Sequence, residues 1–494
     1  MDRKKDTAQL AFENFYLPFG GQLRGENRWV ILAGHIPWDQ VEEAYGENFC
    51  DDNGSPAKSA RIALGALLIK ERLGASDRET VDQIRENPYL QYFLGFKEYQ
   101  DQPPFDASLM THFRKRFDPV MLNQVNESIV ARAKADEAPK PANDTKDEDD
   151  DSASPAPKGP LIVEAPCTPA DITCPTDLRL LNAAREKSEE MIDAMHAPAV
   201  GGGPKPRTYR QKACRAYLSI AKQKKPGYKK IRKAIGQQLR YLRRNLGSID
   251  RMIRDGLLGL LNKRLYRLLL VIQELYRQQH WMYHHRTHSI PDRLVSLYQP
   301  HVRPIVRGKV KSPVEFGAKV SISLVEGYGF VEKIGWDAYN ESCDLIEQIE
   351  GYRQRLGFYP ASVHVDQIYR TRANRHYCKE KGIRLSGPPL GKPIREAALR
   401  KEQQRRRRQD EIDRIAVEGK FGQGKRRFSL ARIMTKLART SEVAITITFM
   451  VMNLEKILSA IVFLLRVWPW LPRCRQSSSP RETTRTPNIV AAAA

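Results

Sequence analysis

The stretch LIVEAP at residues 161–166 decides the fold that the sequence predicts. A short apolar run that ends in an acid is typical of a buried strand presenting a carboxylate at its tip. A second strand of this kind, SVHVDQIY at residues 362–369, carries Asp366 near its end. Residues 314–335 alternate between apolar and polar side chains around a Glu-Gly pair, which predicts a β-hairpin. The sequence therefore predicts a sheet with two strand-borne acids.

Helices are expected around these strands. The segments SCDLIEQIEGYRQRLG and RANRHYCKEKG read as helices, the strand IRLSG follows, and a last major helix is expected to begin near Asp410. Residues 175–280, between the first strand and the hairpin, are mostly helical in pattern. We therefore expect an α+β fold, in which a mixed β-sheet with flanking helices carries a large helical insertion after its first strand, at about residues 175–300.

The N-terminal part of the chain reads as a separate helical module. SARIALGALLIKERLG places its apolar residues at helical spacing, and Ser76 followed by Glu79 is a capping-box pattern that opens a second helix. A third helix is expected at residues 108–117, and its last turn carries Arg114, Lys115 and Arg116. A three-helix unit that ends in a basic helix is compatible with DNA binding, although many small helical bundles share this pattern.

The domain boundaries follow from changes in composition. Residues 134–160 are rich in Pro, Ser and acids and form an expected linker, because they hold too few apolar residues for a core. The expected organisation is listed in chain order: an N-terminal extension at 1–58, the helical module that could bind DNA at 59–133, the acidic linker at 134–160, the domain of the predicted sheet at 161–460, and a tail at 461–494, disordered at its end.

Charge points to a polyphosphate partner. The 494 residues include 82 Lys and Arg against 58 Asp and Glu, which gives a net charge of +24. Residues 201–233 are dense in Lys and Arg with Tyr209, Tyr217 and Tyr228 between them, as expected of a surface that follows a phosphate backbone. The alternative for this segment is a solvated helix face.

The sequence argues against a secreted, zinc-ribbon or membrane protein. None of the seven cysteines has CxxC spacing, and the N-terminus MDRKKDTAQL lacks the apolar core of a signal peptide. The apolar stretch at residues 457–472 is short and is interrupted by Arg466. We therefore expect a cytoplasmic protein without a membrane partner.

Three acids stand where a metal-dependent nuclease would need them. Glu164 ends the first strand, Asp366 lies on a later strand, and Glu418 lies on the last major helix. Phosphodiester cleavage by two hard cations requires oxygen ligands, which carboxylates supply. Arg414 lies one helical turn before Glu418, so a guanidinium and a metal-binding carboxylate can meet one phosphate. Lys425 can add a charge to the DNA backbone.

With these residues the chain resembles the DDE transposases of bacterial insertion sequences over most of residues 60–460. The similar blocks are RENPYLQYFLGF, PFDASLMTHFRKRF, LIVEAPCTPADITCPTDLRLLNAAREKSEEMID, SVHVDQIYRTRANRHYCKEKGIRLSGPPLGKP and RIAVEGKFGQGKRRFSLARIMTKLARTSEVAITITFMVMNLEKIL. The resemblance implies an RNase H-like core, with Glu164, Asp366 and Glu418 as the catalytic residues. It implies that these acids hold two Mg²⁺ ions, which Mn²⁺ can replace.

The resemblance also implies what the protein binds. DNA is the expected partner, as the terminal inverted repeats of the transposon and as target DNA, and a homo-oligomer is expected on the DNA of a bacterial nucleoid. The chain would cut at the transposon ends and join the freed 3′-OH to the target. The residues expected to contact DNA are Tyr369, Arg370, Arg414, Lys425, Arg114, Lys115 and Arg116.

The chain departs from the family pattern at two positions. The first acid of the family is an Asp, whereas this chain has Glu164, whose oxygens lie roughly 1–1.5 Å further from the backbone. Glu411 stands where the family often has Tyr. The first departure suggests the alternative hypothesis of a transposase copy that is catalytically weakened or inactive and acts only by binding DNA.

The histidines of residues 280–288 have spacings that a metal site could use, at His280, His284, His285 and His288. Because no Cys or carboxylate completes an obvious ligand set, we favour a structural or phosphate-contacting role for them.

Overall fold

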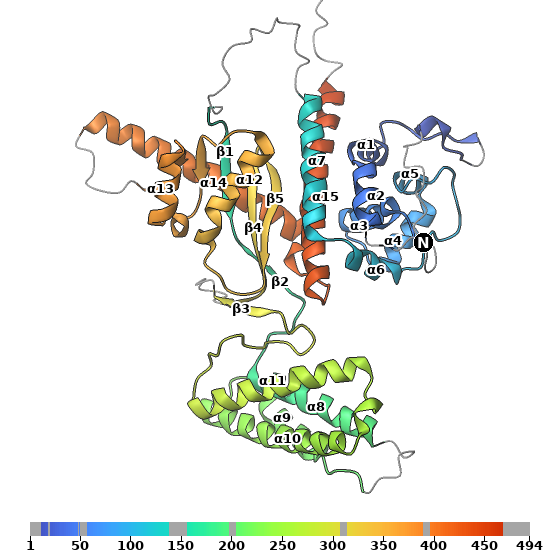
Figure 1. The fold of residues 1–494 in the computed structure, drawn as a ribbon, viewed down its shortest axis with the longest axis vertical. Helices are drawn as coiled ribbons and strands as arrows, with labels where there is room; N and C mark the ends of the chain where they lie inside the picture. The colour runs from blue at the N-terminus through green and yellow to red at the C-terminus, as the bar shows by residue number, and fades with distance from the viewer. Residues whose placement is uncertain are drawn as a thin grey trace, which may run out of the picture.

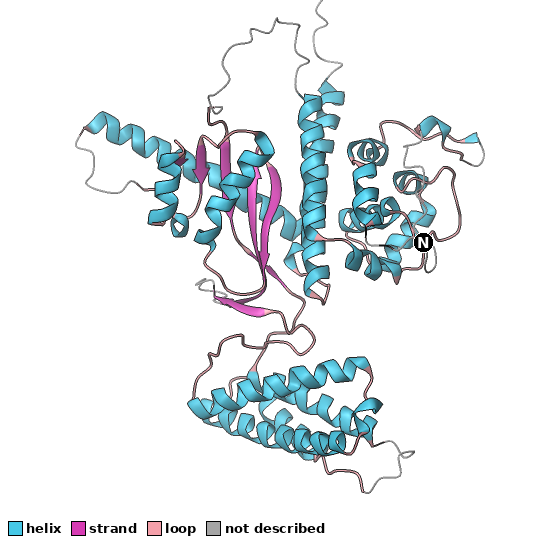
Figure 2. Ribbon diagram, viewed as in Figure 1, coloured by secondary structure: helices cyan, strands magenta, loops and turns pink. Residues whose placement is uncertain are grey.

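The computed structural model describes most of the chain, and its main parts are drawn in Figures 1 and 2. Most of the expected acidic linker and most of the expected tail lie outside the described residues. The structure describes residues 11–17, 20–47, 49, 57–137, 156–196, 204–306, 314–388 and 396–467.

The N-terminal part is a cluster of short helices followed by one long helix. Ser59 and Ser76 cap two of the helices, and the predicted helix start at Ser76 is confirmed because Ser76 Oγ accepts a hydrogen bond from the Glu79 amide at 3.2 Å. Pro88 begins the next helix after the Asn87 cap, which explains the interruption seen in the sequence. The helices are α1 (Arg28–His35), α2 (Trp38–Gly46), α3 (Ala60–Leu73), α4 (Asp77–Glu86), α5 (Pro88–Phe93), α6 (Leu109–Arg116) and α7 (Pro119–Glu137).

The central part is a mixed seven-stranded sheet. Its longest strand, β4, is antiparallel to β1 and to β5, whereas β1 pairs in parallel with β6, and β6 pairs in parallel with β7. The predicted hairpin is confirmed: β4 and β5 are joined at Glu326 and Gly327, both with positive φ. The strands are β1 (Pro160–Glu164), β2 (Cys167–Pro169), β3 (Arg303–Val306), β4 (Val314–Val325), β5 (Tyr328–Gly335), β6 (Ser362–His364) and β7 (Arg384–Leu385).

Helices cover both faces of this sheet. On one face, α12 (Leu345–Leu356) buries its apolar side chains with Leu161 and Val163 of β1. On the other face, α14 (Ala397–Arg427) packs Val417 with Ile162. Successive side chains of β1 are therefore buried against opposite faces, one under α12 and the other under α14, as expected of a central strand. The other elements here are α13 (Arg372–Glu380), η5 (Glu341–Asp344), η6 (Gln367–Tyr369) and η7 (Ser429–Ala431).

The helix that was predicted to be the last major one begins earlier than expected, and the long helix α15 (Ala438–Val467) follows it. We expected its start near Asp410, but α14 begins at Ala397 and includes the Arg405–Arg408 run. The prediction was wrong because residues AALRKEQQRRRR are nearly all strong helix formers, and their lack of an apolar face hid the helix. In Figure 1 this part of α14 extends beyond the edge of the sheet.

A long apolar helix, α15 (Ala438–Val467), joins the N-terminal helices to the sheet. It runs beside α7 in Figure 1, and its Asn453 donates hydrogen bonds to Asn126 Oδ1 of α7 at 3.0 Å and to the Gly329 carbonyl of β5 at 2.8 Å. Residues 438–463 are long and apolar enough to cross a membrane, but 72% of the most apolar window is buried inside the protein. This burial identifies α15 as a core helix.

The segment between β2 and β3 is helical. It forms a bundle with its own apolar core, drawn below the sheet in Figure 1. Its elements are α8 (Asp177–Met195), α9 (Arg210–Ala221), α10 (Tyr228–Arg254), η4 (Leu257–Leu260) and α11 (Lys263–His285), and one further short element, η1 (Phe12–Asn14), lies near the N-terminus. The structure thus shows N-terminal helices followed by a mixed sheet with flanking helices.

Candidate functional site

Glu164 and Asp366 lie at the same edge of the sheet. Strands β1 and β6 are parallel neighbours with Ile162 opposite His364, so the register continued by two residues brings Glu164 opposite Asp366. Glu164 is half-buried at the end of β1, and Asp366 is exposed just beyond β6. The carboxylate of Asp366 accepts a hydrogen bond from the Gln367 amide at 2.7 Å and so caps η6.

Helix α14 presents one flank to this edge. Residues of an α-helix are about 100° apart around its axis, so Arg414 and Lys420 lie about 60° to either side of the buried Val417. Lys420 donates a hydrogen bond to the Gly327 carbonyl at 3.1 Å, in the β4–β5 turn next to the start of β1. Arg414 points the other way, and its Nη1 lies 3.9 Å from Oδ1 of Asp366.

Glu418 is on the same flank of α14 as Arg414. It lies about 100° from Val417, and Lys425 about 80°, both in the direction of Arg414. Glu418 is exposed and Lys425 is half-buried. Arg414, Glu418 and Lys425 therefore share one flank of α14, and Arg414 on this flank lies beside Asp366.

The residues that follow Asp366 differ in exposure. Tyr369 is only 1% exposed, and burial raises the pKa of its phenol, so a DNA contact through this residue would need a rearrangement of η6. Arg370 donates from Nη1 to the Ser386 carbonyl at 2.7 Å and is half-buried. A small pocket beside Asp366 is lined by Arg370, Arg407 and Arg414 and also by two acids, Asp410 and Glu411.

The basic residues at the end of α6 are mostly held by the protein itself. Arg114 is buried, and its guanidinium pairs with the Asp77 carboxylate, with one contact of 3.0 Å. Arg116 is half-buried and stacks on Phe49, with 4.8 Å from its Cζ to the ring centre. Lys115 is exposed and so is available for a partner.

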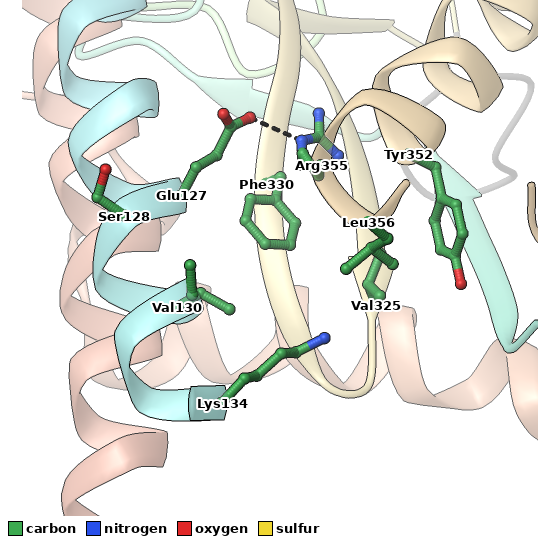
Figure 3. A pocket seen from close by; sticks show the side chains of 10 residues that line it. Glu127, Ser128, Val130, Lys134, Val325, Phe330, Tyr352, Arg355 and Leu356 are labelled. Carbon is green, nitrogen blue, oxygen red and sulfur yellow. Dashed lines mark hydrogen bonds and ion pairs between the residues drawn. The ribbon is translucent and has the colours of Figure 1, made fainter. Parts of the chain in front are cut away.

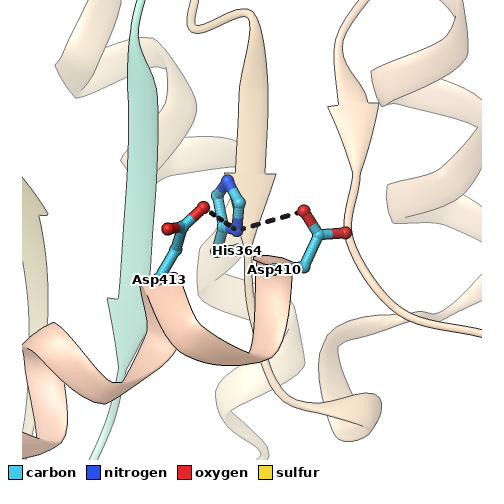
Figure 4. A group of neighbouring side chains, drawn as sticks. All are labelled: His364, Asp410 and Asp413. Carbon is cyan, nitrogen blue, oxygen red and sulfur yellow. Dashed lines mark ion pairs between the residues drawn. The ribbon is translucent and has the colours of Figure 1, made fainter. Parts of the chain in front are cut away.

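A second group of polar side chains includes His364, two residues before Asp366 on the chain (Figure 4). The sequence reasoning missed this group. His364 of β6 faces Asp410 and Asp413 of α14, with its Nδ1 at 3.7 Å and 3.9 Å from their nearest oxygens. Burial lowers the pKa of His364, although the two carboxylates oppose this shift. The i, i+2 spacing of His364 and Asp366 on one strand was the signal that could have revealed the group.

The histidines of residues 280–288 lie in the last turns of α11 and just after this helix. His280 and His284 approach each other at 3.1 Å between their Nε2 atoms, and His285 Nδ1 lies 2.9 Å from the Trp281 carbonyl. His288 lies 3.5 Å from Asp177. Within the described ranges, only the His364 group gathers three groups able to hold a metal ion.

The positive charge of the chain is concentrated in the insertion. Residues 204–300 contain 23 Lys and Arg but only 4 Asp and Glu, so they carry 19 of the 24 net charges. Many of these cations are exposed along α9, α10 and the segment between them, including Lys229, Lys230 and Lys233. Arg244 stacks over Tyr209, with its Cζ 4.4 Å from the ring centre. One of the tyrosines between the basic residues is therefore in contact with a guanidinium group of the protein itself.

Two further hollows lie where the N-terminal helices meet the sheet. One lies between α7 and α12 and contains the Glu127–Arg355 hydrogen bond of 2.6 Å, together with Phe330 and Lys134 (Figure 3). The other is a groove of about 870 Å³ between α3, α6, η7 and the start of α15, and it is partly basic. Its cations are Lys70, Arg114, Arg426, Arg427 and Lys436.

Two regions of the chain match known protein families. Residues 19–116 match the transposase domain DUF772, and residues 363–455 match the transposase DDE domain, which includes Asp366 and Glu418. An uncharacterized protein, ORF8 in the nfe locus of Rhizobium meliloti, is 41% identical over 104 residues, which are 21% of this chain and 50% of that protein. The chain thus covers about half the length of this curated relative.

No solved structure matches the chain. A DDE domain implies phosphoryl transfer on DNA with divalent metal ions. The chain thus combines, in its two matched regions, a DUF772 transposase domain with a transposase DDE domain.

Proposed function

We propose that this chain binds the ends of its insertion sequence, cuts them in a metal-dependent reaction and joins them to target DNA. The observation that carries the proposal is the parallel pairing of β1 and β6, which aligns Glu164 with Asp366 at one sheet edge. The flank of α14 that carries Glu418 faces this edge, since Arg414 on that flank lies 3.9 Å from Asp366. The strand order β5-β4-β1-β6-β7 supports an RNase H-like core.

The proposed site suits Mg²⁺ by the chemistry of its donors. Glu164, Asp366 and Glu418 offer carboxylate oxygens, which are the ligands that Mg²⁺ and Mn²⁺ prefer. When bound, a pair of such ions would activate the attacking oxygen and stabilise the leaving oxygen. Arg414, beside Asp366, can hold the scissile phosphate by two parallel hydrogen bonds, and Lys425 can contribute a point charge to a neighbouring phosphate.

DNA is proposed to contact three regions of the chain. The helices of residues 59–133 would read the terminal repeat, with Lys115 exposed to it, and the catalytic domain would hold the cleavage site. The insertion, with 19 net positive charges over residues 204–300, would hold the DNA backbone without reading its sequence. Pairing two ends for joining requires at least two protomers, so we propose a homo-oligomer on DNA.

The test is a cleavage assay with the purified chain and a labelled duplex that carries the sequence flanking its gene. With Mg²⁺ or Mn²⁺, we expect a specific nick at the element boundary, and Asp366→Asn should abolish the nick without loss of binding. Uniform nicking of unrelated duplexes, or cleavage that survives Asp366→Asn, would contradict the proposed function.

The second candidate is a copy that binds its DNA but cuts poorly. The supporting observation is Glu164 itself, because a glutamate displaces the carboxylate and a misplacement of about 1 Å can reduce a rate on the order of a hundredfold. In the same assay, this candidate predicts binding with little cleavage by the native chain and a gain of cleavage in Glu164→Asp. No gain in Glu164→Asp would count against it.

A further inference from the structure

We propose that His364, Asp410 and Asp413 form a separate site for a transition-metal dication such as Zn²⁺ or Mn²⁺, which fastens α14 to β6. This site would differ from the carboxylate site of the strand edge in its nitrogen ligand. Imidazole suits Zn²⁺ and related transition-metal ions, and carboxylates suit Mn²⁺. A set of one nitrogen and two carboxylates therefore fits either ion better than Mg²⁺, which favours oxygen ligands alone. The inference does not depend on the proposed DNA chemistry.

The spacing of the three groups fits a shared ion better than direct contact. The Nδ1 of His364 lies 3.7 Å from Asp410 Oδ1 and 3.9 Å from Asp413 Oδ2, and all three ligand atoms lie within 4.8 Å of one another. Distances above about 3.5 Å are too long for hydrogen bonds. Atoms that each lie about 2.0–2.2 Å from one ion are separated by roughly 3–4 Å, so a small inward movement completes the site.

The histidine is buried and aimed at the carboxylates. His364 is only 1% exposed, and its Nδ1 makes no hydrogen bond within the described part of the chain (Figure 4). A buried polar atom without a partner costs free energy, so the position calls for a ligand. Asp413 keeps 35% of its side chain exposed, which gives an ion a path from solvent.

The second polar atom of each ligand is held by a neighbour. His364 Nε2 lies 2.9 Å from Ser362 Oγ, so that with a metal on Nδ1 the Nε2–H donates to this oxygen. Asp410 Oδ2 accepts from Arg384 at 2.9 Å, and Asp413 Oδ1 accepts from Gln409 at 2.8 Å. Such outer contacts are characteristic of metal sites, where they orient the ligands.

An ion here would act as a positioning device for the strand edge. His364 precedes Asp366 by two residues on β6, and Asp413 directly precedes Arg414 on α14. Because the ion would join these two elements, it would fix the distance between Asp366 and the flank of α14 that carries Glu418. The three ligands themselves need not contact DNA.

The experiment measures metal binding by the full chain after its metals have been removed with a chelator. We use the double variant Asp366→Asn, Glu418→Gln, so that the strand-edge acids do not contribute, and add one equivalent of Mn²⁺ in the presence of excess Mg²⁺. Pulsed electron paramagnetic resonance should detect a nitrogen nucleus coupled to the Mn²⁺. In a parallel sample, Zn²⁺ should remain bound at one equivalent after gel filtration.

The matched controls separate ligation from folding. His364→Gln should remove the nitrogen coupling and weaken binding at least about tenfold, whereas His301→Gln, at another partly buried histidine, should change neither. Asp413→Asn, at a partly exposed position, should also weaken binding if His364→Gln does not fold. The inference would be overturned if the double variant did not bind the metal tightly. It would also be overturned if the nitrogen coupling survived in folded His364→Gln, or if Asp413→Asn bound the metal as tightly as before.

Discussion

At the scale of the residue, Lys420 gives the protein a pH-dependent stability. Burial, with the charge of Lys456 nearby, lowers the pKa of Lys420 from 10.5 to about 8. The unfolded chain therefore binds this proton more tightly than the folded chain between those pH values, and the protonated lysine opposes folding fully below pH 8. This opposition fades as the pH rises to about 10.5, where the lysine is neutral in both states.

We therefore predict that Lys420→Met stabilises the chain relative to the native sequence at pH 7, and that this advantage is lost by about pH 10.5. The change across this window corresponds to about 3 kcal/mol. The hydrogen bond to Gly327, which the variant lacks at every pH, lowers the stability of the variant by a constant amount and leaves this change unaltered. The check is the difference in Tm between the two proteins over the pH range. A difference that is constant with pH would show that Lys420 keeps its ordinary pKa.

The residues of the candidate site were predictable to different degrees. Glu164 and Asp366 could be picked out because each follows an apolar strand, and the parallel register of these strands could not be read from the chain. His364 was missed because a lone histidine in an apolar run reads as core, and its partners Asp410 and Asp413 lie on an element distant in sequence. Glu418 was found only through the resemblance and the spacing to Arg414.

At the scale of the element, the α9–α10 region of the insertion is expected to hold the DNA backbone. We predict that Lys229→Gln, Lys230→Gln and Lys233→Gln together weaken binding to unrelated duplexes about tenfold or more. The slope of log affinity against log salt should fall by about 2 to 3, because each lost phosphate contact removes about 0.9. Fluorescence anisotropy over a salt series measures both quantities.

The control for this prediction is the same triple replacement by Arg, which keeps the charge and should keep the salt slope. If the Gln variant retained the native slope, these exposed cations would be solvated and not in contact with DNA.

Elements with an apolar face or a turn signal were predictable, and elements without one were not. The hairpin was predictable because a Glu-Gly pair stands between two segments of alternating apolar and polar residues. The structure confirms it, with Glu326 and Gly327 in the turn. The start of α14 was misplaced because its first turns are polar on every side. The apolar helix α15 was not recognised as a core element, since its buried side chains are distributed around its axis.

At the scale of the whole molecule, the N-terminal helices are anchored through Glu71 to η7 and α15, in the region that matches the transposase DDE domain. This buried side chain of α3 accepts hydrogen bonds from the Ser429 amide at 3.0 Å and from Thr448 Oγ1 of α15 at 2.7 Å. A neighbouring ion pair joins Arg72 of α3 to Glu455 of α15. The two parts are therefore joined by polar contacts that are satisfied only in the docked arrangement.

We predict that Glu71→Ala destabilises this docking by about 2–3 kcal/mol, because it leaves buried donors of the partner without acceptors. Thermal unfolding should then show an earlier transition, while Glu98→Ala, at an exposed position after α5, should unfold like the native chain. A Glu71→Ala protein with the native Tm would contradict the anchoring role.

The measurement that tests the central claim most directly compares cleavage by three single variants, Glu164→Gln, Asp366→Asn and Glu418→Gln, with Asp337→Asn as an exposed control acid. If the three acids hold the same metal ions, each variant should lose at least about a hundredfold in cleavage rate and keep native affinity for the DNA, while Asp337→Asn cleaves normally. Cleavage that depends on Asp366 but survives the loss of Glu164 or Glu418 would contradict a single three-acid site.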